Sequence, residues 1–287
     1  MTHRLMWLLG ATLLLVTPVA SAEPFVFTAI PDEDETRLQK RFQKVADYLT
    51  DELDHDVRFV PVKSYSAAVT AFRNDQVQLA WFGGLSGVQA RERVPGSRAI
   101  AQGVEDTEFR TYIIANEDTR LETDAGLSDE MRDLSLTFGS KSSTSGRLMP
   151  EYYLREHFGE PPEETFSRVG FSGNHSRTIS LVASGAYQLG AVNYAVWENE
   201  VEAGEIDTDA VRVIWKTPRY PDYQWTIRGD IDDRFGDGFT EQVQQALLTM
   251  DDPDLLESFP REGFIKADND DYAVIKEVGN ELGLLDP

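Results

Sequence analysis

The chain has 287 residues, with 50 Asp and Glu against 27 Lys and Arg, which gives a formal net charge of −23 at pH 7. So acidic a protein repels phosphate backbones and anionic headgroups, which argues against nucleic acid and membrane surfaces as partners. The chain contains no cysteine, so disulfide bonds and a lipid anchor on an N-terminal cysteine are excluded. The acidic residues are spread along the sequence, as in DEDE at 32–35, which is typical of a solvated coat.

The first 22 residues have the pattern of a secretory signal peptide. Arg4 supplies the charged start, an apolar run follows from Leu5 to Val16, and Ala20-Ser21-Ala22 is a small-residue cleavage site. The run is shorter than the roughly 18 apolar residues that a membrane span needs. We therefore predict an exported protein that begins at Glu23, resides in a bacterial periplasm and does not insert into the membrane after cleavage.

Strand and helix patterns alternate in the first part of the mature chain. Five apolar residues recur at spacings typical of one face of a helix: Leu38, Phe42, Val45, Leu49 and Leu53. Helices are predicted over 38–53 and 64–74, and strands over 25–30, 56–62 and 77–83. Alternation with short connections predicts an α/β lobe with a largely parallel sheet.

The same alternation returns after an extended segment at 111–118. Strands are predicted over 134–140, 166–171 and 189–196, and helices over 145–158 and 177–185. The segment 211–218 leads back, and helical material follows at 239–249, 252–257 and 270–284. The sequence thus predicts an α/β fold of two lobes, with residues 23–112 and 218–287 in lobe 1 and residues 113–217 in lobe 2.

The segment SSTSG, residues 142–146, places three hydroxyl side chains and a glycine before a helical pattern. One Ser or Thr is enough to cap a helix. The alternative is that the hydroxyl groups and the free N–H groups behind them bind an anion at the helix N-terminus. Pro150 lies too deep for the first turn if Ser145 is the cap, so a short initial turn or a kink is expected there.

Four segments, in order and with similar spacing, resemble the phosphonate-, phosphite- and phosphate-binding family of periplasmic solute-binding proteins: AWFGGLSG (80–87), FGSKSSTSGRLMPEYYL (138–154), GNHSRTISLVASGAYQLGAVNYAVWE (173–198) and VIWKTP (213–218). The resemblance covers nearly the whole mature chain. It implies a two-lobed type II periplasmic-binding-protein fold, an oxyanion held in the cleft between the lobes, delivery to an ABC permease in the inner membrane, and neither catalysis, cofactor nor metal. Some similar sequences carry a selenate-transporter label.

The resemblance also implies ligand-binding positions, which are Tyr65, Ser143, Thr144, Ser145 and His175. Gly146 would let the backbone approach the ligand closely. Two of these residues also allow a structural interpretation, because Tyr65 sits where a helix begins and a lone histidine near a strand end is more often structural. The match to the family favours the ligand-binding interpretation for both.

Phe109 stands where the aminophosphonate-binding member of the family has a tyrosine. It is followed by Arg110, which either adds a positive charge at the cleft or pairs with Glu108 or Asp106. We retain Phe109 and Arg110 as candidate ligand-binding residues.

Two carboxylates of that family member are missing or shifted. Its ligand-facing glutamate aligns with Ala195, close to Asn193, and its aspartate beyond the second crossing falls at Tyr223, with Asp222 one place earlier. Because these carboxylates would recognise a ligand amino group, 2-aminoethylphosphonate is disfavoured and a small inorganic oxyanion is favoured. Asn193 and Asp222 complete the set of candidate ligand-binding residues.

Protonation separates the candidate ligands. A buried carboxylate such as that of Asp222 would accept a proton from hydrogen phosphate or hydrogen phosphite and repel fully ionised sulfate or selenate, whereas a site made only of donors would accept either class. Phosphite, phosphate, methylphosphonate and selenate therefore all stay open.

Two other classes of protein remain as alternatives to an importer component. A hydrolase would use Ser143 and His175, but the chain has no G-x-S-x-G motif and no assigned orienting acid. A sensory module would use the same cleft to present the anion to a membrane receptor. We predict a monomeric binding protein rather than an enzyme.

Overall fold

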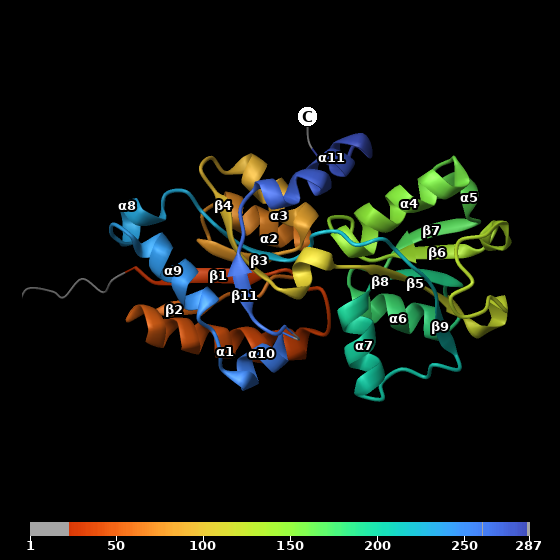
Figure 1. Cartoon of the computed structure of the whole chain (residues 1–287), viewed down its shortest axis with the longest axis horizontal. Helices are drawn as coiled ribbons and strands as arrows, with labels where there is room; N and C mark the ends of the chain where they lie inside the picture. The colour runs from red at the N-terminus through yellow and green to blue at the C-terminus, as the bar shows by residue number, and fades with distance from the viewer. Residues whose placement is uncertain (1–22, 260, 286–287) are drawn as a thin grey trace, which may run out of the picture.

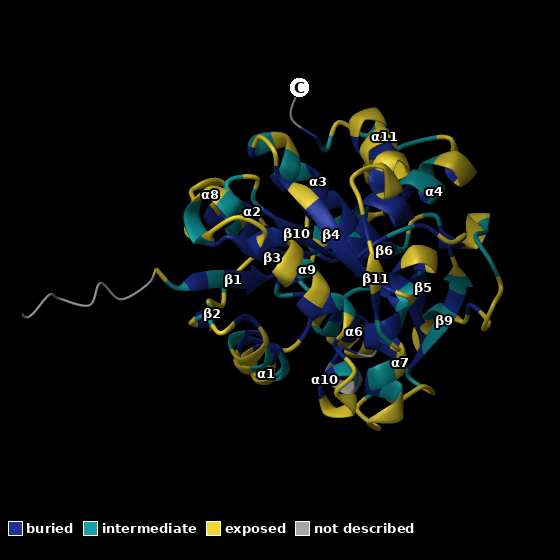
Figure 2. Ribbon diagram, turned by 60° about the vertical axis from the view of Figure 1, so that its left-hand side comes forward, coloured by how far each residue is buried: buried dark blue, intermediate teal, exposed yellow. Residues whose placement is uncertain are grey.

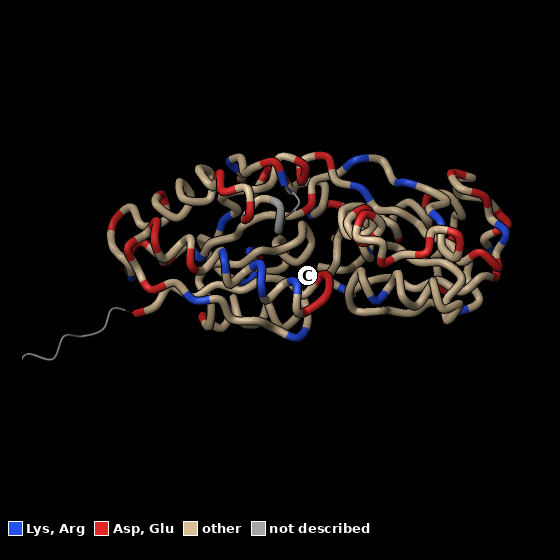
Figure 3. The backbone as a smooth tube through the Cα atoms, turned by 90° about the horizontal axis from the view of Figure 1, so that it is seen from below, with Lys and Arg blue, Asp and Glu red and all other residues tan. Residues whose placement is uncertain are grey.

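The computed structural model describes residues 23–259 and 261–285, so the predicted signal peptide lies outside the described residues. Figure 1 shows two lobes side by side, each built on its own sheet. The first sheet has six strands in the order β11-β4-β10-β3-β1-β2, and the second has five in the order β7-β6-β8-β5-β9. The charged residues in Figure 3 are distributed over both lobes.

The first sheet takes its strands from both ends of the chain: β1 (Phe25–Ala29), β2 (Val57–Phe59), β3 (Leu79–Phe82), β4 (Arg98–Gly103), β10 (Gln224–Ile227) and β11 (Phe264–Lys266). The second sheet takes its strands from the middle: β5 (Thr111–Asn116), β6 (Ser135–Phe138), β7 (Arg168–Phe171), β8 (Leu189–Asn193) and β9 (Val211–Lys216). Thr111 and Tyr112, which the sequence assigned to lobe 1, pair with β8 and β9 in the second sheet.

Each sheet combines parallel and antiparallel pairs, which differs from the largely parallel sheets expected. β1 is parallel to β2 and β3, but β10 is antiparallel to β3 and β4. In the second sheet β6 is parallel to β7 and β8, but β5 is antiparallel to β8 and β9. The physical reason is that β5 and β10 arrive from the other lobe. Each enters its sheet at the carboxyl end of the neighbouring strand, with Thr111 opposite Asn193 and Gln224 opposite Phe82.

The helices of lobe 1 are α1 (Glu35–Leu53), α2 (Tyr65–Arg73), α3 (Gly84–Arg93), α8 (Ile231–Phe235), α9 (Phe239–Leu248), α10 (Pro253–Ser258) and α11 (Ala273–Glu281). Those of lobe 2 are α4 (Met149–Phe158), α5 (Pro162–Thr165), α6 (His175–Ala183) and α7 (Tyr194–Glu202). Helix α1 shows why the prediction succeeded, because its five periodic apolar residues are all buried and Asp34 caps its first turn. Figure 2 shows the buried strands between helices whose outer faces are exposed.

Aromatic side chains form the core of lobe 1 beneath the edge that faces lobe 2. The rings of Trp81 and Trp225 lie 5.2 Å apart, and Trp225 meets Phe42 edge-on at 6.2 Å. Tyr223 stacks on Trp81 with 5.5 Å between ring centroids. A densely packed base of this kind holds the polar residues above it in fixed positions.

Two extended crossings join the lobes. They pair through two backbone hydrogen bonds, from Phe109 N–H to the Tyr220 carbonyl at 2.8 Å and from Tyr220 N–H to the Phe109 carbonyl at 3.1 Å. The Tyr220 hydroxyl also lies 2.5 Å from the Thr111 hydroxyl. The crossings therefore form a short two-stranded hinge.

The strand predicted over 189–196 is too long. β8 ends at Asn193, whose side chain accepts a hydrogen bond from Val196 N–H and begins α7 at Tyr194. The apolar run continues across this boundary because both the end of the strand and the first turn of the helix are buried. Apolar character alone does not separate the two elements.

Candidate ligand-binding site

Seven of the sequence-predicted residues meet where the two lobes face each other. They stand at strand ends and helix starts, and all of them are buried: Tyr65, Ser143, Thr144, Ser145, His175, Asn193 and Asp222. Tyr65 is the first residue of α2 and His175 the first of α6, while Asn193 ends β8. The carboxyl edges of the two sheets thus supply side chains to one space, as is usual for ligand sites in α/β folds.

Five buried polar atoms around this space have no hydrogen-bond partner among the described residues: the Tyr65 hydroxyl, Ser145 Oγ, His175 Nε2, Asp222 Oδ2 and Asp32 Oδ1. Charges on Asp32 and Asp222 both act on the Tyr65 phenol, and the Ser145 hydroxyl acts on Asp222. Buried polar groups in proteins are almost always paired, so this cluster indicates groups that a ligand satisfies. We call this cluster of five unpartnered atoms, together with the residues that carry them, the ligand chamber.

The three consecutive hydroxyl groups have different partners. Ser143 Oγ accepts a hydrogen bond from Gly146 N–H at 2.9 Å and is the cap. Thr144 Oγ1 accepts one from Leu85 N–H of lobe 1 at 3.0 Å. Ser145 Oγ faces the chamber. The run therefore contains a cap, a contact with lobe 1 and a hydroxyl group that has no partner among the described residues.

A π-helical turn over Thr144–Leu148 precedes α4. This turn confirms the expected short initial turn, because it ends before Pro150, which then lies in the first turn of α4, where a missing N–H is tolerated. Gly146 lies in this turn, where there is no room for a side chain. A Cβ added there would lie 2.9 Å from Ser143 Oγ and 3.0 Å from His175 Cε1.

His175 is arranged as an uncharged donor. Its Nδ1 accepts a hydrogen bond from Asn193 N–H at 3.3 Å, which leaves the ring hydrogen on Nε2, the atom that faces the chamber. Burial lowers the pKa of His175 to about 3, so the imidazole is neutral at physiological pH. Across the cleft, His175 N–H donates to the Asp32 carbonyl at 2.8 Å.

Asp222 is the acceptor of the chamber. Its Oδ1 receives a hydrogen bond from Gly84 N–H, at the start of α3, at 2.9 Å, whereas Oδ2 is unpartnered. Burial raises the pKa of Asp222 to about 7, and hydrogen bonds from Thr144 and Gly84 oppose that shift. Asp222 thus exchanges a proton readily near neutral pH.

Of the remaining candidates, Asn193 and Phe109 are buried, whereas Arg110 lies outside the chamber. Asn193 Nδ2 donates to the Tyr223 hydroxyl across the cleft at 3.0 Å, so Asn193 connects the lobes. Phe109 is buried, with its ring 5.3 Å from that of Tyr223. Arg110 lies outside the chamber, in a hollow that Tyr112, Tyr194 and Glu198 also line.

Neither pairing offered for Arg110 by the sequence is found. Asp106 pairs with Arg261 at 2.7 Å, and Glu108 pairs with Arg219. Asp106 and Glu108 are therefore paired with Arg261 of lobe 1 and Arg219 of the second crossing, and not with Arg110.

Sequence reasoning missed Asp32 as a residue of the site. Asp32 and Glu33 belong to the acidic run interpreted as a solvated coat, yet both are buried. The reason is their position, because the run begins shortly after β1 ends at Ala29 and its first residues lie at the edge of the sheet that faces lobe 2. A carboxylate immediately after a buried strand was the available signal.

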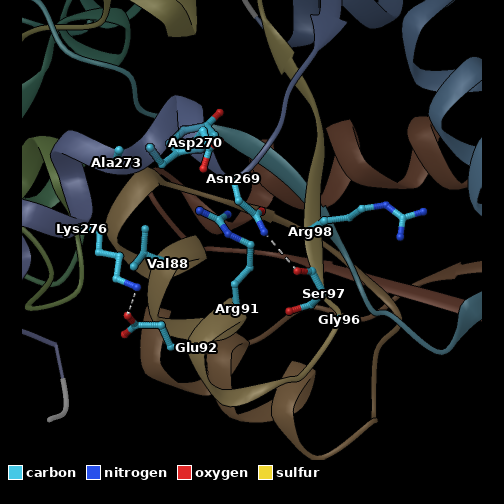
Figure 4. A pocket seen from close by; sticks show the side chains of 11 residues that line it. Val88, Arg91, Glu92, Gly96, Ser97, Arg98, Asn269, Asp270, Ala273 and Lys276 are labelled. Carbon is cyan, nitrogen blue, oxygen red and sulfur yellow. Dashed lines mark hydrogen bonds and ion pairs between the residues drawn. The ribbon is translucent and has the colours of Figure 1, made fainter.

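A hollow of about 650 Å³ lies elsewhere on lobe 1, between α3 and the start of α11, and shares no residue with the chamber (Figure 4). Three of its charged groups, Arg91, Glu92 and Lys276, have partners in the protein. Lys276 Nζ pairs with Glu92 at 3.1 Å, and Arg91 donates to Gln224 and Thr226.

Comparison with known proteins identifies the family. Residues 27–272 match the family described as "ABC transporter, phosphonate, periplasmic substrate-binding protein". The chain belongs to this family. It is 41% identical over 261 residues, 88% of both chains, to the "Probable ABC transporter phosphite binding protein PhnD1" of Prochlorococcus marinus. It is 24% identical over 257 residues, 86% of this chain and 77% of the other, to the "Phosphate-import protein PhnD" of Mycolicibacterium smegmatis.

The solved structures agree with this assignment. The structure of Prochlorococcus marinus PhnD1 in complex with methylphosphonate is 40% identical, covers 91% of this chain and 98% of its own, and superposes with a TM-score of 0.86. The two-lobed periplasmic-binding-protein fold implied by the resemblance is thereby confirmed. Among the described residues, none of the helices has the length and apolar character to span a membrane. Members of the family are substrate-binding components of ABC transporters.

Proposed function

We propose that this chain is the periplasmic component of an ABC importer that binds a small phosphorus oxyanion in the ligand chamber and presents it to an inner-membrane permease. The observation that carries the proposal is the set of unpartnered buried atoms from both lobes. Closing the lobes around an anion would satisfy these atoms together, which couples binding to the shape that a permease recognises.

The donors of the chamber suit an anion on an acidic protein. Tyr65, Ser145 and His175 each offer a hydrogen without carrying a positive charge. Burial raises the pKa of Tyr65 well above its usual value, so the phenol keeps its hydrogen. Fixed dipoles of this kind stabilise an anion in a buried site without requiring a Lys or Arg counter-ion.

The acceptor favours phosphorus over sulfur and selenium. Asp222 Oδ2 needs a hydrogen from the ligand, and the monoanions of phosphite, phosphate and methylphosphonate bring one on a P–OH group. Sulfate and selenate are fully ionised at neutral pH and would leave two negative groups in contact. The names of the relatives, which include phosphite, phosphate and methylphosphonate, support the same class.

Calorimetric titration of residues 23–287, purified free of phosphate, tests the proposal. The panel contains phosphite, phosphate, methylphosphonate, 2-aminoethylphosphonate, selenate and sulfate. We expect tight binding of a small phosphorus anion and no binding of sulfate or selenate. Preference for sulfate or selenate would overturn the proposed ligand class.

Ser145→Ala tests the chamber itself. Removing a donor to a charged group should weaken binding by about 1–3 kcal/mol. Ser142→Ala is the matched control, because Ser142 lies in the same run but is partly exposed and outside the chamber. Equal affinities of the two variants would remove the Ser145 hydroxyl from the site.

A role in sensing would use the same chamber and is separated by a transport assay. If the importer proposal is right, deletion of the gene abolishes uptake of the bound anion by cells. Normal uptake with loss of a transcriptional response would indicate a sensor. We propose that the protein acts as a monomer, which size-exclusion chromatography with light scattering measures directly.

A further inference from the structure

Asp32 is a second carboxyl group at the ligand chamber. It follows β1 in lobe 1, the residue is 6% exposed, and Oδ1 has no partner among the described residues. Its backbone carbonyl accepts the His175 N–H from lobe 2 at 2.8 Å, which fixes the residue beside the start of α6. A buried carboxylate oxygen accepts hydrogen bonds only, so it requires a hydrogen that the protein does not provide.

The nearby cations have carboxylate partners other than Asp32. Arg41 pairs with Glu33 at 2.5 Å, and Arg261 pairs with Asp106 at 2.7 Å. The titratable and charged groups that surround Asp32 from its own loop and from the elements packed against it are Glu33, Arg41, Tyr65, His175, Asp222, Tyr223 and Arg261. The Tyr223 hydroxyl acts to lower the pKa of Asp32, against the effect of burial, and Oδ1 has no hydrogen-bond partner among the described residues.

The chamber therefore places two acceptor-only oxygens, Asp32 Oδ1 and Asp222 Oδ2, beside the groups that we propose bind an anion. An anion with two negative charges would meet two buried carboxylates, and repulsion between buried charges is strong. The repulsion is relieved when a proton is bound between the ligand and the carboxyl groups.

We propose that Asp32 is a second specificity-determining acid of the chamber; this inference rests on the proposed function. Together with Asp222, it restricts the chamber to oxyanions that bind with a proton, so that fully ionised tetrahedral anions are rejected. Asp222 and Asp32 both act on the Tyr65 phenol, so the selection does not depend on one carboxylate.

The direction of the pH dependence follows from burial. Burial, followed by the charge of Glu33, raises the pKa of Asp32 in the closed form to about 6. The closed form therefore holds a proton more tightly than the open form, in which the side chain meets water. Affinity should rise as pH falls from about 8 to about 6, and binding should take up protons from solution.

The test compares wild type, Asp32→Asn and Asp34→Asn by calorimetry with methylphosphonate and sulfate at pH 6, 7 and 8. Asp34 is the matched control, because it is exposed, lies two residues away, and Asn keeps its capping of α1 while removing one charge. We expect Asp32→Asn to bind sulfate at least tenfold more tightly than wild type does, and its methylphosphonate affinity to vary less with pH. Asp34→Asn should behave as wild type.

Different results of this experiment would overturn the proposed function and the role of Asp32. If wild type binds none of the phosphorus anions, the proposed function fails. If wild type binds methylphosphonate but Asp32→Asn has the same sulfate affinity and pH profile, the role of Asp32 is wrong and the function stands.

If Asp32→Asn does not fold, as shown by loss of its cooperative thermal transition, a second variant provides the test. The quantity measured is then the proton uptake that accompanies methylphosphonate binding by Asp222→Asn. Heats of methylphosphonate binding in buffers of different ionisation enthalpy report that uptake. Because Asp32 is intact in Asp222→Asn, uptake should persist at pH 7. Zero uptake in that variant would overturn the proposal.

Discussion

Thr144 reports on closure more directly than its neighbours. It lies in lobe 2, but its Oγ1 accepts the Leu85 N–H of lobe 1, and its hydroxyl also lowers the pKa of Asp222. The hydrogen bond from Leu85 exists only while the lobes are together. Replacing Thr144 by Val removes the oxygen that accepts this hydrogen bond, and it should therefore make the closed form less stable.

We expect Thr144→Val to weaken ligand binding by about 1–3 kcal/mol, because the Leu85 N–H becomes a buried donor without an acceptor. Thr144→Ser keeps the oxygen and should bind within a few-fold of wild type. Calorimetry gives the affinity, and thermal melting without ligand shows whether folding has changed. A lower melting temperature with unchanged affinity would assign Thr144 to folding instead of closure.

Short helices and strands limit what the sequence reveals about this fold. Helix α1 was predictable because its apolar period runs from Leu38 to Leu53, through most of a 19-residue helix. Strands β10 and β11 have four and three residues, and their identity depends on partners far away in the chain, such as Trp81 opposite Trp225. No local pattern encodes that pairing, so these strands were missed.

In the candidate site, too, some residues could be found from the local sequence, whereas others depend on contacts between distant parts of the chain. The hydroxyl run and His175 stand at helix starts, where a sequence match located them. Asp32 and the Gly84 N–H depend on which strand ends share an edge. The partner of Asp222 at Gly84 lies 138 positions away in the sequence, and only the folded sheet brings the two together.

The start of α3 lies close to lobe 2. A Cβ added at Gly83 would lie 3.0 Å from Asp222 Oδ1 and 3.3 Å from Thr144 Oγ1. The first contact is within lobe 1 and the second is across the cleft. Glycine is therefore required here for close approach, since the backbone of Gly83 has an ordinary extended conformation.

Gly83→Ala should reduce ligand affinity at least tenfold, on the order of 1.4 kcal/mol or more, by holding the lobes slightly apart. Gly263→Ala is the control, since a Cβ there meets no heavy atom within 4 Å among the described residues. Calorimetry and melting temperatures of both variants provide the test. Wild-type affinity in Gly83→Ala would show that the start of α3 yields without affecting closure.

At the scale of the whole molecule, the closed form has a latch at the edge of the cleft. Arg37 of α1 bonds to Glu205 at 2.9 Å and to Glu200 at 3.1 Å, both in lobe 2. The Glu200 side chain is only 8% exposed, while Glu205 is half exposed. Because the hinge at Phe109 and Tyr220 lies apart from this contact, opening about the hinge must break the latch before ligand leaves.

Arg37→Gln should therefore speed ligand dissociation while association changes less. Partly exposed ion pairs contribute roughly 0.5–1 kcal/mol, which corresponds to a two- to fivefold faster dissociation. Stopped-flow fluorescence from the tryptophans measures both rates. Salt should accelerate dissociation of wild type more than that of the variant, because screening weakens the latch only where it exists. Arg58→Gln, whose Asp56 partner lies in the same lobe, controls for loss of a surface charge.

Small-angle scattering shows whether the latch acts on closure itself. A saturating phosphorus anion should make wild type more compact, and Arg37→Gln should reach the same compact form with a larger open fraction at subsaturating ligand. Identical scattering of wild type with and without ligand would contradict a cleft that closes. Equal dissociation rates in wild type and Arg37→Gln would show that the buried contacts, from His175 to Asp32 and from Asn193 to Tyr223, hold the lobes together without the latch. Closure would then depend on the chamber alone, and ligand release would be governed by the same groups that select the ligand.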